Sequence, residues 1–163
     1  RIEAPNDPNS YCEKNWMPVE HEPWTYIKWS NATEIVSVNK EEGTSKTTHL
    51  KEWVWLPNDL RGGSQALPYG DGYIALCHEV DLFRSEHDRK DAVYKHRFVI
   101  WDKDWNIIKY SRSFLILDGQ VEFSVGMCYY NNDILITFGF TDNASYVLKT
   151  SSGVLQRFID GKL

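Results

Sequence analysis

The sequence has few cysteines, no long hydrophobic run and no excess of positive charge, and each absence excludes a class of protein. The three cysteines, Cys12, Cys77 and Cys128, are odd in number and widely spaced, so they predict neither a disulfide framework nor a CxxC zinc or redox site. The longest apolar runs, residues 98–101 and 114–117, are far shorter than the roughly 20 residues that a membrane-spanning helix needs. The 18 Lys and Arg residues are scattered in a chain of net charge −5, which gives no basic face for nucleic acid. We therefore expect neither a membrane nor a nucleic acid as a partner.

A signal segment is also absent from the start of the sequence. The chain opens at Arg1, with neither a Met nor an apolar run, which predicts a piece of a longer protein. The location of the protein stays open, and the lack of a signal peptide and of a disulfide framework favours the cytoplasm.

Helical periodicity is almost absent, whereas strand signals are strong. The best helical candidate, residues 85–92, is polar all round and is expected to be a solvated loop. Runs rich in β-branched and aromatic residues, each followed by a polar turn, predict three β-hairpins. These hairpins are expected over residues 24–29 and 34–38, residues 73–80 and 96–101 with a long loop 81–93, and residues 133–140 and 144–149.

Each hairpin has a leading strand before it, and two of them have a weaker outer strand after it. The leading strands are expected at residues 15–19, 63–68 and 123–129, and the outer strands at residues 107–111 and 154–158. A spacing of about 50 to 60 residues matches the four-stranded blade of a β-propeller.

The sequence therefore predicts a single all-β domain of the β-propeller type, with units over approximately residues 12–56, 61–112 and 121–160. About three blades leave the ring incomplete, because a closed propeller needs at least four. The chain would then belong to a longer propeller, borrow blades from a partner, or pack as an open stack of sheets. A two-sheet β-sandwich is the alternative, since short strands with turn signals are typical of it too.

Several segments resemble a known family. They are residues 61–65, 73–80, 94–98, 121–127 and 138–144. Together they resemble the five-bladed β-propellers related to glycoside hydrolases, notably the mannoside-phosphorylase-like group, over residues 12–160 and in the later blades only. The resemblance implies a ligand site at the propeller axis, lined by polar residues of the innermost strands. It also implies inverting chemistry by a carboxylic acid together with a second carboxylate or phosphate. The general acid of that family normally sits in an earlier blade, and this chain has no counterpart of it.

Two acids are the catalytic candidates. Glu122, in a Glu-x-x-x-Gly pattern, resembles the axis-facing acid of the family, and Asp142 stands where the family has an Asp that touches sugar hydroxyls. The alternatives are a solvated or salt-bridged Glu at a strand start and an ordinary turn Asp. Inverting hydrolysis would require the two carboxyl groups to lie about 6.5–9.5 Å apart.

Six further residues are the candidates for substrate binding. His78, Glu79, His96 and Arg97 gather on one hairpin, where Arg and His supply donors for sugar hydroxyls or an anion. The alternative is a cross-strand network that holds the loop 81–93. Arg61 and Gln65 flank two glycines, as expected where backbone approaches a ligand, and a flexible turn is the alternative there.

The predicted function is that of a carbohydrate-active or carbohydrate-binding propeller domain, glycoside hydrolase-like or phosphorylase-like if it is an enzyme. A non-catalytic glycan-binding module and a structural assembly module of a larger protein are the alternatives. The expected partners are a carbohydrate or glycan, and another chain or missing blades that complete the propeller. No cofactor and no metal are expected, because no third ligand joins the two His at a suitable spacing. Trp53 and Trp55 are the aromatic pair expected to be exposed for stacking on sugar rings.

Overall fold

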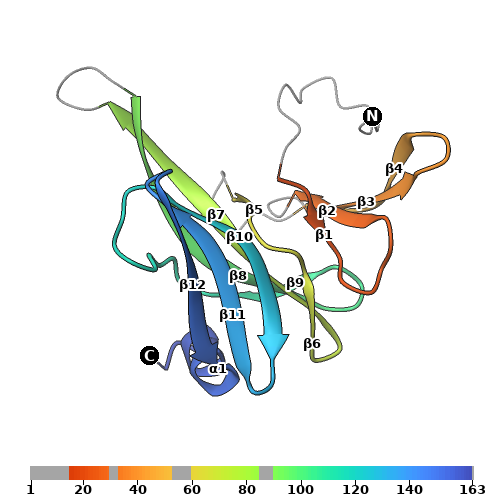
Figure 1. The fold of residues 1–163 in the computed structure, drawn as a ribbon. Helices are drawn as coiled ribbons and strands as arrows, with labels where there is room; N and C mark the ends of the chain where they lie inside the picture. The colour runs from red at the N-terminus through yellow and green to blue at the C-terminus, as the bar shows by residue number, and fades with distance from the viewer. Residues whose placement is uncertain (1–14, 30–32, 53–59, 85–89, 163) are drawn as a thin grey trace.

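The computed structural model describes residues 15–29, 33–52, 60–84 and 90–162, which form three antiparallel sheets and one helix (Figure 1). The predicted pair Trp53 and Trp55 lies outside these residues. None of the described helical residues makes up a segment long and apolar enough to span a membrane. The all-β prediction is confirmed, and three stacked sheets are present where a sandwich would have two.

The first sheet has four strands in chain order. They are β1 (Met17–Pro18), β2 (Thr25–Trp29), β3 (Thr33–Asn39) and β4 (Thr44–Lys51). The predicted hairpin over residues 24–29 and 34–38 corresponds to β2 and β3 and is confirmed. Strand β4 was not expected, because it is polar along almost its whole length and has no buried residue. It pairs with β3 as an outer strand.

The second sheet lies in the middle of the chain and carries its longest strands. Its strands are β5 (Arg61–Gly62), β6 (Leu67–Tyr69), β7 (Gly72–Arg84), β8 (Lys90–Trp101) and β9 (Ile107–Tyr110). Both β5 and β6 pair with β7, so together they form one inner strand that is interrupted at residues 63–66. With this interrupted strand counted once, the sheet is a four-stranded blade.

The prediction of a long loop over residues 81–93 is wrong. The β7–β8 ladder continues from Asp81 opposite Val93 to Arg84 opposite Lys90. Charged residues made this segment resemble a loop, and one of them, Asp81, pairs with Lys95 of β8, with 2.7 Å between Oδ2 and Nζ. A two-stranded ribbon exposed on both faces tolerates such residues.

The third sheet has three strands followed by a helix. They are β10 (Glu122–Tyr130), β11 (Asp133–Phe140), β12 (Ala144–Ser151) and α1 (Ser152–Ile159). The predicted outer strand over residues 154–158 is wrong, because this segment lies inside α1. Ser151 caps the helix by accepting a hydrogen bond from the Val154 amide, and Leu155 and Ile159, one turn apart, are buried.

The inner strands of the three sheets lie parallel and side by side. Val19, which follows β1, forms a parallel bridge with Ala66. The side-chain amide of Gln65 pairs with the backbone of Met127 in β10, accepting from its N–H at 3.1 Å and donating to its carbonyl. The sheets therefore fan out from a common line of inner strands, as propeller blades do.

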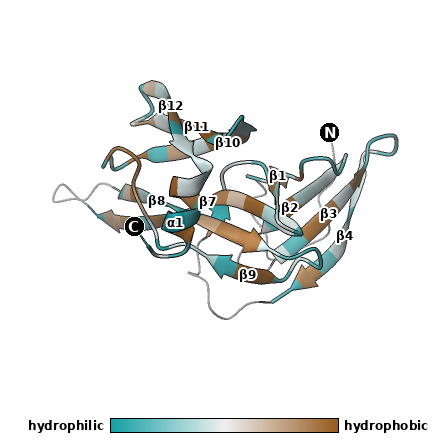
Figure 2. Cartoon of the chain, turned by 90° about the horizontal axis from the view of Figure 1, so that it is seen from below, coloured by the Kyte–Doolittle hydropathy of each residue, from teal (hydrophilic) through white to brown (hydrophobic). Residues whose placement is uncertain are grey.

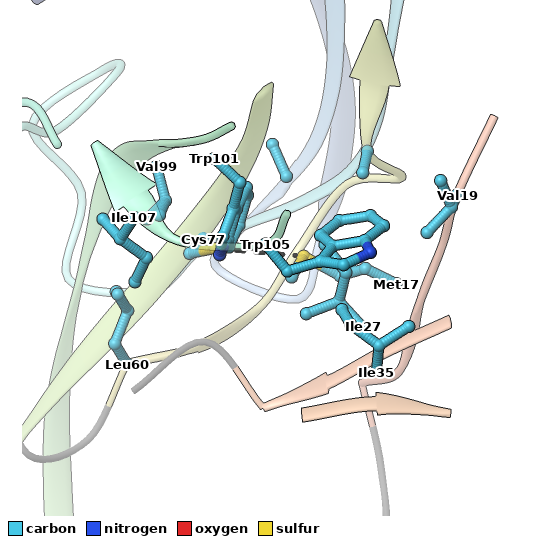
Figure 3. Close-up of a cluster of buried hydrophobic side chains, with 12 residues drawn as sticks. Met17, Val19, Ile27, Ile35, Leu60, Cys77, Val99, Trp101, Trp105 and Ile107 are labelled. Atoms are coloured by element: carbon cyan, nitrogen blue, oxygen red, sulfur yellow. Dashed lines mark hydrogen bonds between the residues drawn. The ribbon is translucent and has the colours of Figure 1, made fainter. Parts of the chain in front are cut away.

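Two apolar clusters fill the spaces on the two faces of the second sheet. Toward the first sheet, Trp101, Trp105 and Cys77 pack with Met17 and its neighbours, and the Cys77 Sγ lies 3.8 Å from the Met17 Sδ (Figure 3). Toward the third sheet, the cluster includes Leu76 of β7. Viewed from the end that carries α1, the hydrophobic residues of β7 and β8 lie between the two outer sheets (Figure 2).

Candidate functional site

All three inner strands begin at the same end of the molecule, which we call the entry end (top of Figure 1). The register of the ladders places most of the predicted site residues there. Arg61 and Glu122 begin inner strands, and Asp142 lies in the turn between β11 and β12. The four residues of the β7–β8 hairpin lie at the same end, because His78 pairs with Arg61 on one side and with His96 on the other. Gln65 lies further along the inner strand, in the interruption between β5 and β6.

The four hairpin residues divide between the two faces of the second sheet. His78 and His96 are directly opposite one another and both are buried. The His78 ring packs against Phe123 of the third sheet, at 4.8 Å between ring centroids, and against Tyr94 at 5.7 Å. Glu79 and Arg97 occupy the alternate positions and therefore point to the other face. The structure thus brings together two pairs and not one cluster of four.

Glu122 is a fully buried carboxylate that binds backbone amides. It accepts hydrogen bonds from the N–H groups of Ile116, Leu117 and Gly119 at 2.5–2.8 Å. These three donors belong to the connection between β9 and β10, so Glu122 holds that loop at the entry end. Gly119 packs so closely on the Phe140 ring that a Cβ there would lie 2.2 Å from a ring carbon. The loop is therefore fixed from two sides.

His96 lies beside this carboxylate, with its Nδ1 3.9 Å from the Glu122 Oε2. Within the described parts of the chain, neither ring nitrogen of His96 has a hydrogen-bond partner. Burial lowers the pKa of His96 to about 4, although the Glu122 charge acts in the opposite direction. At neutral pH the ring is therefore uncharged.

Arg97 and Glu79 form a salt bridge on the opposite face of the ladder. The Arg97 Nη2 lies 3.1 Å from one Glu79 oxygen and 3.3 Å from the other. The Nη1 donates to the Ser111 carbonyl at 2.6 Å, and the guanidinium lies over the Tyr110 ring at 5.6 Å. Both side chains of the pair are largely buried. This pair contains the Glu and the Arg of the cross-strand His–Glu–Arg network that was the alternative to ligand binding, whereas His78 and His96 lie on the other face of the sheet.

The remaining candidates differ in exposure. Asp142 is exposed in its turn, with a φ of 52°, and the backbone of the preceding Thr141 donates to the Val121 carbonyl at 2.8 Å. Arg61 is partly buried, opposite His78. Gln65 is engaged by the backbone of β10, so its amide joins the second sheet to the third. Asp142 is thus the one exposed residue among these three candidates, and Arg61 and Gln65 are partly buried.

The sequence did not point to the loop that Glu122 holds. This loop presents Asp118, exposed and with a φ of 63°, next to the start of β10. The Asp118-Gly119 dipeptide after the apolar run 114–117 was the available signal, because an Asp followed by Gly is typical of a tight turn. The aromatic residues Tyr94 and Phe123, which surround His78, were also missed as members of the site.

The described residues contain no group of three His, Cys, Asp or Glu side chains arranged to hold a metal ion. Two cavities of the described structure are lined by none of the predicted site residues. One, of about 520 Å³, follows the β3–β4 turn around Asn39 and Thr44. The other, of about 200 Å³, lies between Phe98, Leu148 and Phe158 near α1.

The comparisons with known proteins give a structural likeness. No family model matches the sequence, and no curated protein matches it. Among solved structures the chain is similar to the β-1,2-mannobiose phosphorylase of Listeria innocua, in its complex with β-1,2-mannobiose, with a TM-score of 0.62 and 13% identity. The likeness covers 93% of this chain and 48% of the phosphorylase, so the chain spans about half the length of that protein. The propeller-type fold is therefore shared with a mannoside phosphorylase, at a distance that shows the fold alone. The five-bladed architecture stays a prediction.

Proposed function

We propose that this chain is a carbohydrate-binding part of a β-propeller, with its saccharide site at the entry end. The observation that carries the proposal is that the three parallel inner strands begin at one end of the molecule. This arrangement places Arg61, Glu122 and the β11–β12 turn at one end of a fold that a mannobiose phosphorylase shares. Polar groups from several blades at one end of the axis can contact different hydroxyls of one sugar.

Within this site, the exposed and the buried candidates have different roles. Asp142 and Arg61 contact the saccharide, because a carboxylate accepts and a guanidinium donates hydrogen bonds to hydroxyl groups. His78 and His96 shape the floor between the second and third sheets. Glu79 and Arg97 support the hairpin from the other face, and Gln65 joins the inner strands.

Glycoside hydrolase or phosphorylase activity is the second candidate function. The exposed carboxylate of Asp142 at the entry end favours it. Glu122 is less suited to proton transfer, because both of its oxygens already accept backbone hydrogen bonds. Three blades do not close a ring, so further blades from a longer chain or from another chain would complete the propeller, whereas the saccharide contacts proposed here all belong to this chain.

Titration calorimetry with β-1,2-mannobiose tests the proposal on the full chain. We expect saturable heat for the wild type and binding at least about tenfold weaker for Asp142→Asn and Arg61→Gln, which is roughly 1.4 kcal/mol. Asp71→Asn is the matched control, because Asp71 is an exposed turn Asp between β6 and β7, at the opposite end of the inner strands. Its affinity should equal that of the wild type.

A folded wild-type chain that gives no heat with mannobiose or mannose would overturn the proposal. Release of mannose from mannobiose, with and without inorganic phosphate, decides between binding and catalysis. Activity that persists unchanged in Asp142→Asn would remove Asp142 from the catalytic role.

A further inference from the structure

The outermost strands of the three sheets differ in how well their free edges are protected. These strands are β4, β9 and β12. A free edge presents unpaired N–H and C=O groups that can pair with another strand, and native proteins protect such edges with short strands, bulges and charged residues. The edge with the least protection is therefore the one most able to pair with a strand of another chain.

Strands β4 and β9 carry such protection. The β3–β4 ladder has a register shift between Ile35 and Val36, and β4 contains Lys46 and Lys51. The β8–β9 ladder has a shift between Ile100 and Trp101, and β9 has only four residues. Neither strand offers a long regular edge.

Strand β12 carries less of this protection. It pairs with β11 over eight consecutive residues with no register shift, from Ser151 to Ala144. Its only charged residue, Lys149, is bound to Asp133 of β11 at 2.9 Å. Tyr146 and Val147, at its centre, are 47% and 63% exposed. No described residue pairs with the outer side of β12, whereas the other two sheets each have a fourth strand at that place.

An apolar cavity lies beside this open edge. It has a volume of about 200 Å³, and Leu148 of β12 lines it together with Phe114, Phe158 and Val154. This volume is below the roughly 300–1,000 Å³ of sites for whole small molecules, and it suits a single side chain. An added strand would meet both a row of backbone groups and an apolar pocket, the combination used in recognition by strand addition.

We propose that β12 pairs with β12 of a second copy of this chain, antiparallel about a two-fold axis, to form a continuous six-stranded sheet. Centred on Val147, the pairing places Val147 opposite Val147, Tyr146 opposite Leu148 and Ser145 opposite Lys149. No like charges face one another, and apolar residues meet at the centre. The register also puts the tyrosine of each copy next to the leucine that lines the cavity of the other.

The contact is isologous, so it closes with two copies and does not propagate into fibres. The contact is carried by β12, the strand of the third sheet farthest from the inner strands, and its centre at Val147 lies five residues after Asp142 of the preceding turn.

Sedimentation velocity and light scattering on the full chain test the proposal over a concentration series from about 10 µM to 1 mM, which brackets weak association. We expect the mass to rise from 19.0 kDa to twice that value. Val147→Lys places two like charges opposite one another and should weaken the dimer at least tenfold. Val125→Lys is the matched control, since Val125 is 60% exposed on β10, at the other edge of the same sheet. It should leave the dimer intact.

A wild-type chain that stays at 19.0 kDa throughout the series would overturn the proposal, whether the edge is then free or covered by a different protein. Equal loss of the dimer in both Lys variants would overturn the assignment to β12. The register is checked with Val147→Cys, in a chain with Cys12 and Cys128 replaced by Ser. Directly opposed residues lie about 4.5–5.5 Å apart, so oxidation should cross-link two copies, whereas Val125→Cys should stay uncross-linked.

Discussion

Replacing Glu122 by Ala should destabilise the fold strongly, because the loop before β10 is held by its carboxylate. Three backbone N–H groups, those of Ile116, Leu117 and Gly119, donate to it in a fully buried position. Hydrogen bonds to a charged group contribute about 1.5–3 kcal/mol each, and a buried donor left without a partner costs about 1–3 kcal/mol. Leu117 is half exposed, whereas Gly119 is buried, so the cost of an unpaired donor is largest at Gly119. We expect the free energy of unfolding to fall by about 3–5 kcal/mol.

Urea denaturation, followed by Trp fluorescence, measures this loss. Glu122→Gln keeps one acceptor oxygen and should lose less, about 1–3 kcal/mol. Hydrogen exchange gives the local readout: the amides of residues 116, 117 and 119 should exchange at least about 100-fold faster in the Ala variant. Glu41→Ala, in the exposed β3–β4 turn, is the control and should change stability by less than about 0.5 kcal/mol. If the free energy of unfolding of Glu122→Ala is within about 1 kcal/mol of the wild-type value, the loop does not depend on the Glu122 carboxylate.

Two further predictions concern the same inter-sheet region. Burial lowers the pKa of His96 to about 4 in the folded protein, whereas a His in the unfolded chain has a pKa of about 6.5. Between these two values the unfolded chain binds a proton that the folded protein does not, so the free energy of unfolding falls as the pH falls from about 6.5 toward 4. The free energy of unfolding of the wild type should fall by up to about 1.4 kcal/mol per pH unit in this window, and that of His96→Phe should fall distinctly less. Urea denaturation at about pH 7.5 and about pH 4.5 measures the difference. Equal falls in the two proteins would contradict the assignment to His96. Gly63→Ala should cost more than about 2 kcal/mol, because its Cβ would lie 2.3 Å from the Ser124 Oγ and 2.6 Å from the Leu76 carbonyl oxygen. Gly153→Ala, which meets nothing closer than 4.0 Å in helix α1, should be neutral or stabilising by up to about 1 kcal/mol, and a similar cost at both glycines in thermal denaturation would refute the close approach.

Strands with at least one buried face could be predicted from the sequence, and strands without one could not. Residues 73–80 and 133–140 pack against neighbouring sheets, so their apolar residues made them recognisable. Strand β4 buries none of its side chains, so its sequence lacks that pattern although one edge of its backbone pairs with β3. The same reason explains the end of the β7–β8 ladder, where exposed charges stabilise a ribbon.

Helix α1 was missed because its signals are local and weak. Residues 154–158 contain Val154, Leu155 and Phe158, which also suit a strand. The cap at Ser151 and the spacing of Leu155 and Ile159 favour the helix, and its packing between the second and third sheets stabilises it. Tertiary contacts of this kind override intrinsic propensity.

The sequence could predict which residue types form the candidate site, but it could not predict how these residues are placed or which partners they bind. His78 and Glu79 are adjacent in the sequence, and the two-residue period of a strand sends them to opposite faces. The partners of Glu122 precede it by three to six residues, in a loop that had no recognisable pattern. Long-range partners such as Met127, which Gln65 binds, depend on how the sheets pack, which no single strand encodes.

The burial of these residues separates two ways in which a change can affect saccharide binding. Glu122 and His96 have no exposed surface, so they can influence a ligand only through the loop and the sheets that they support. Asp142 is exposed in a turn, so it can contact a ligand and contributes little to the core. We expect Glu122→Gln to lower the free energy of unfolding more than it lowers the affinity for the saccharide. We expect Asp142→Asn to lower the affinity and to leave the free energy of unfolding nearly unchanged. This pair of results would assign Glu122 to positioning and Asp142 to contact. The sequence motifs alone give Glu122 and Asp142 the same candidate role, and the burial of Glu122 and the exposure of Asp142 distinguish them.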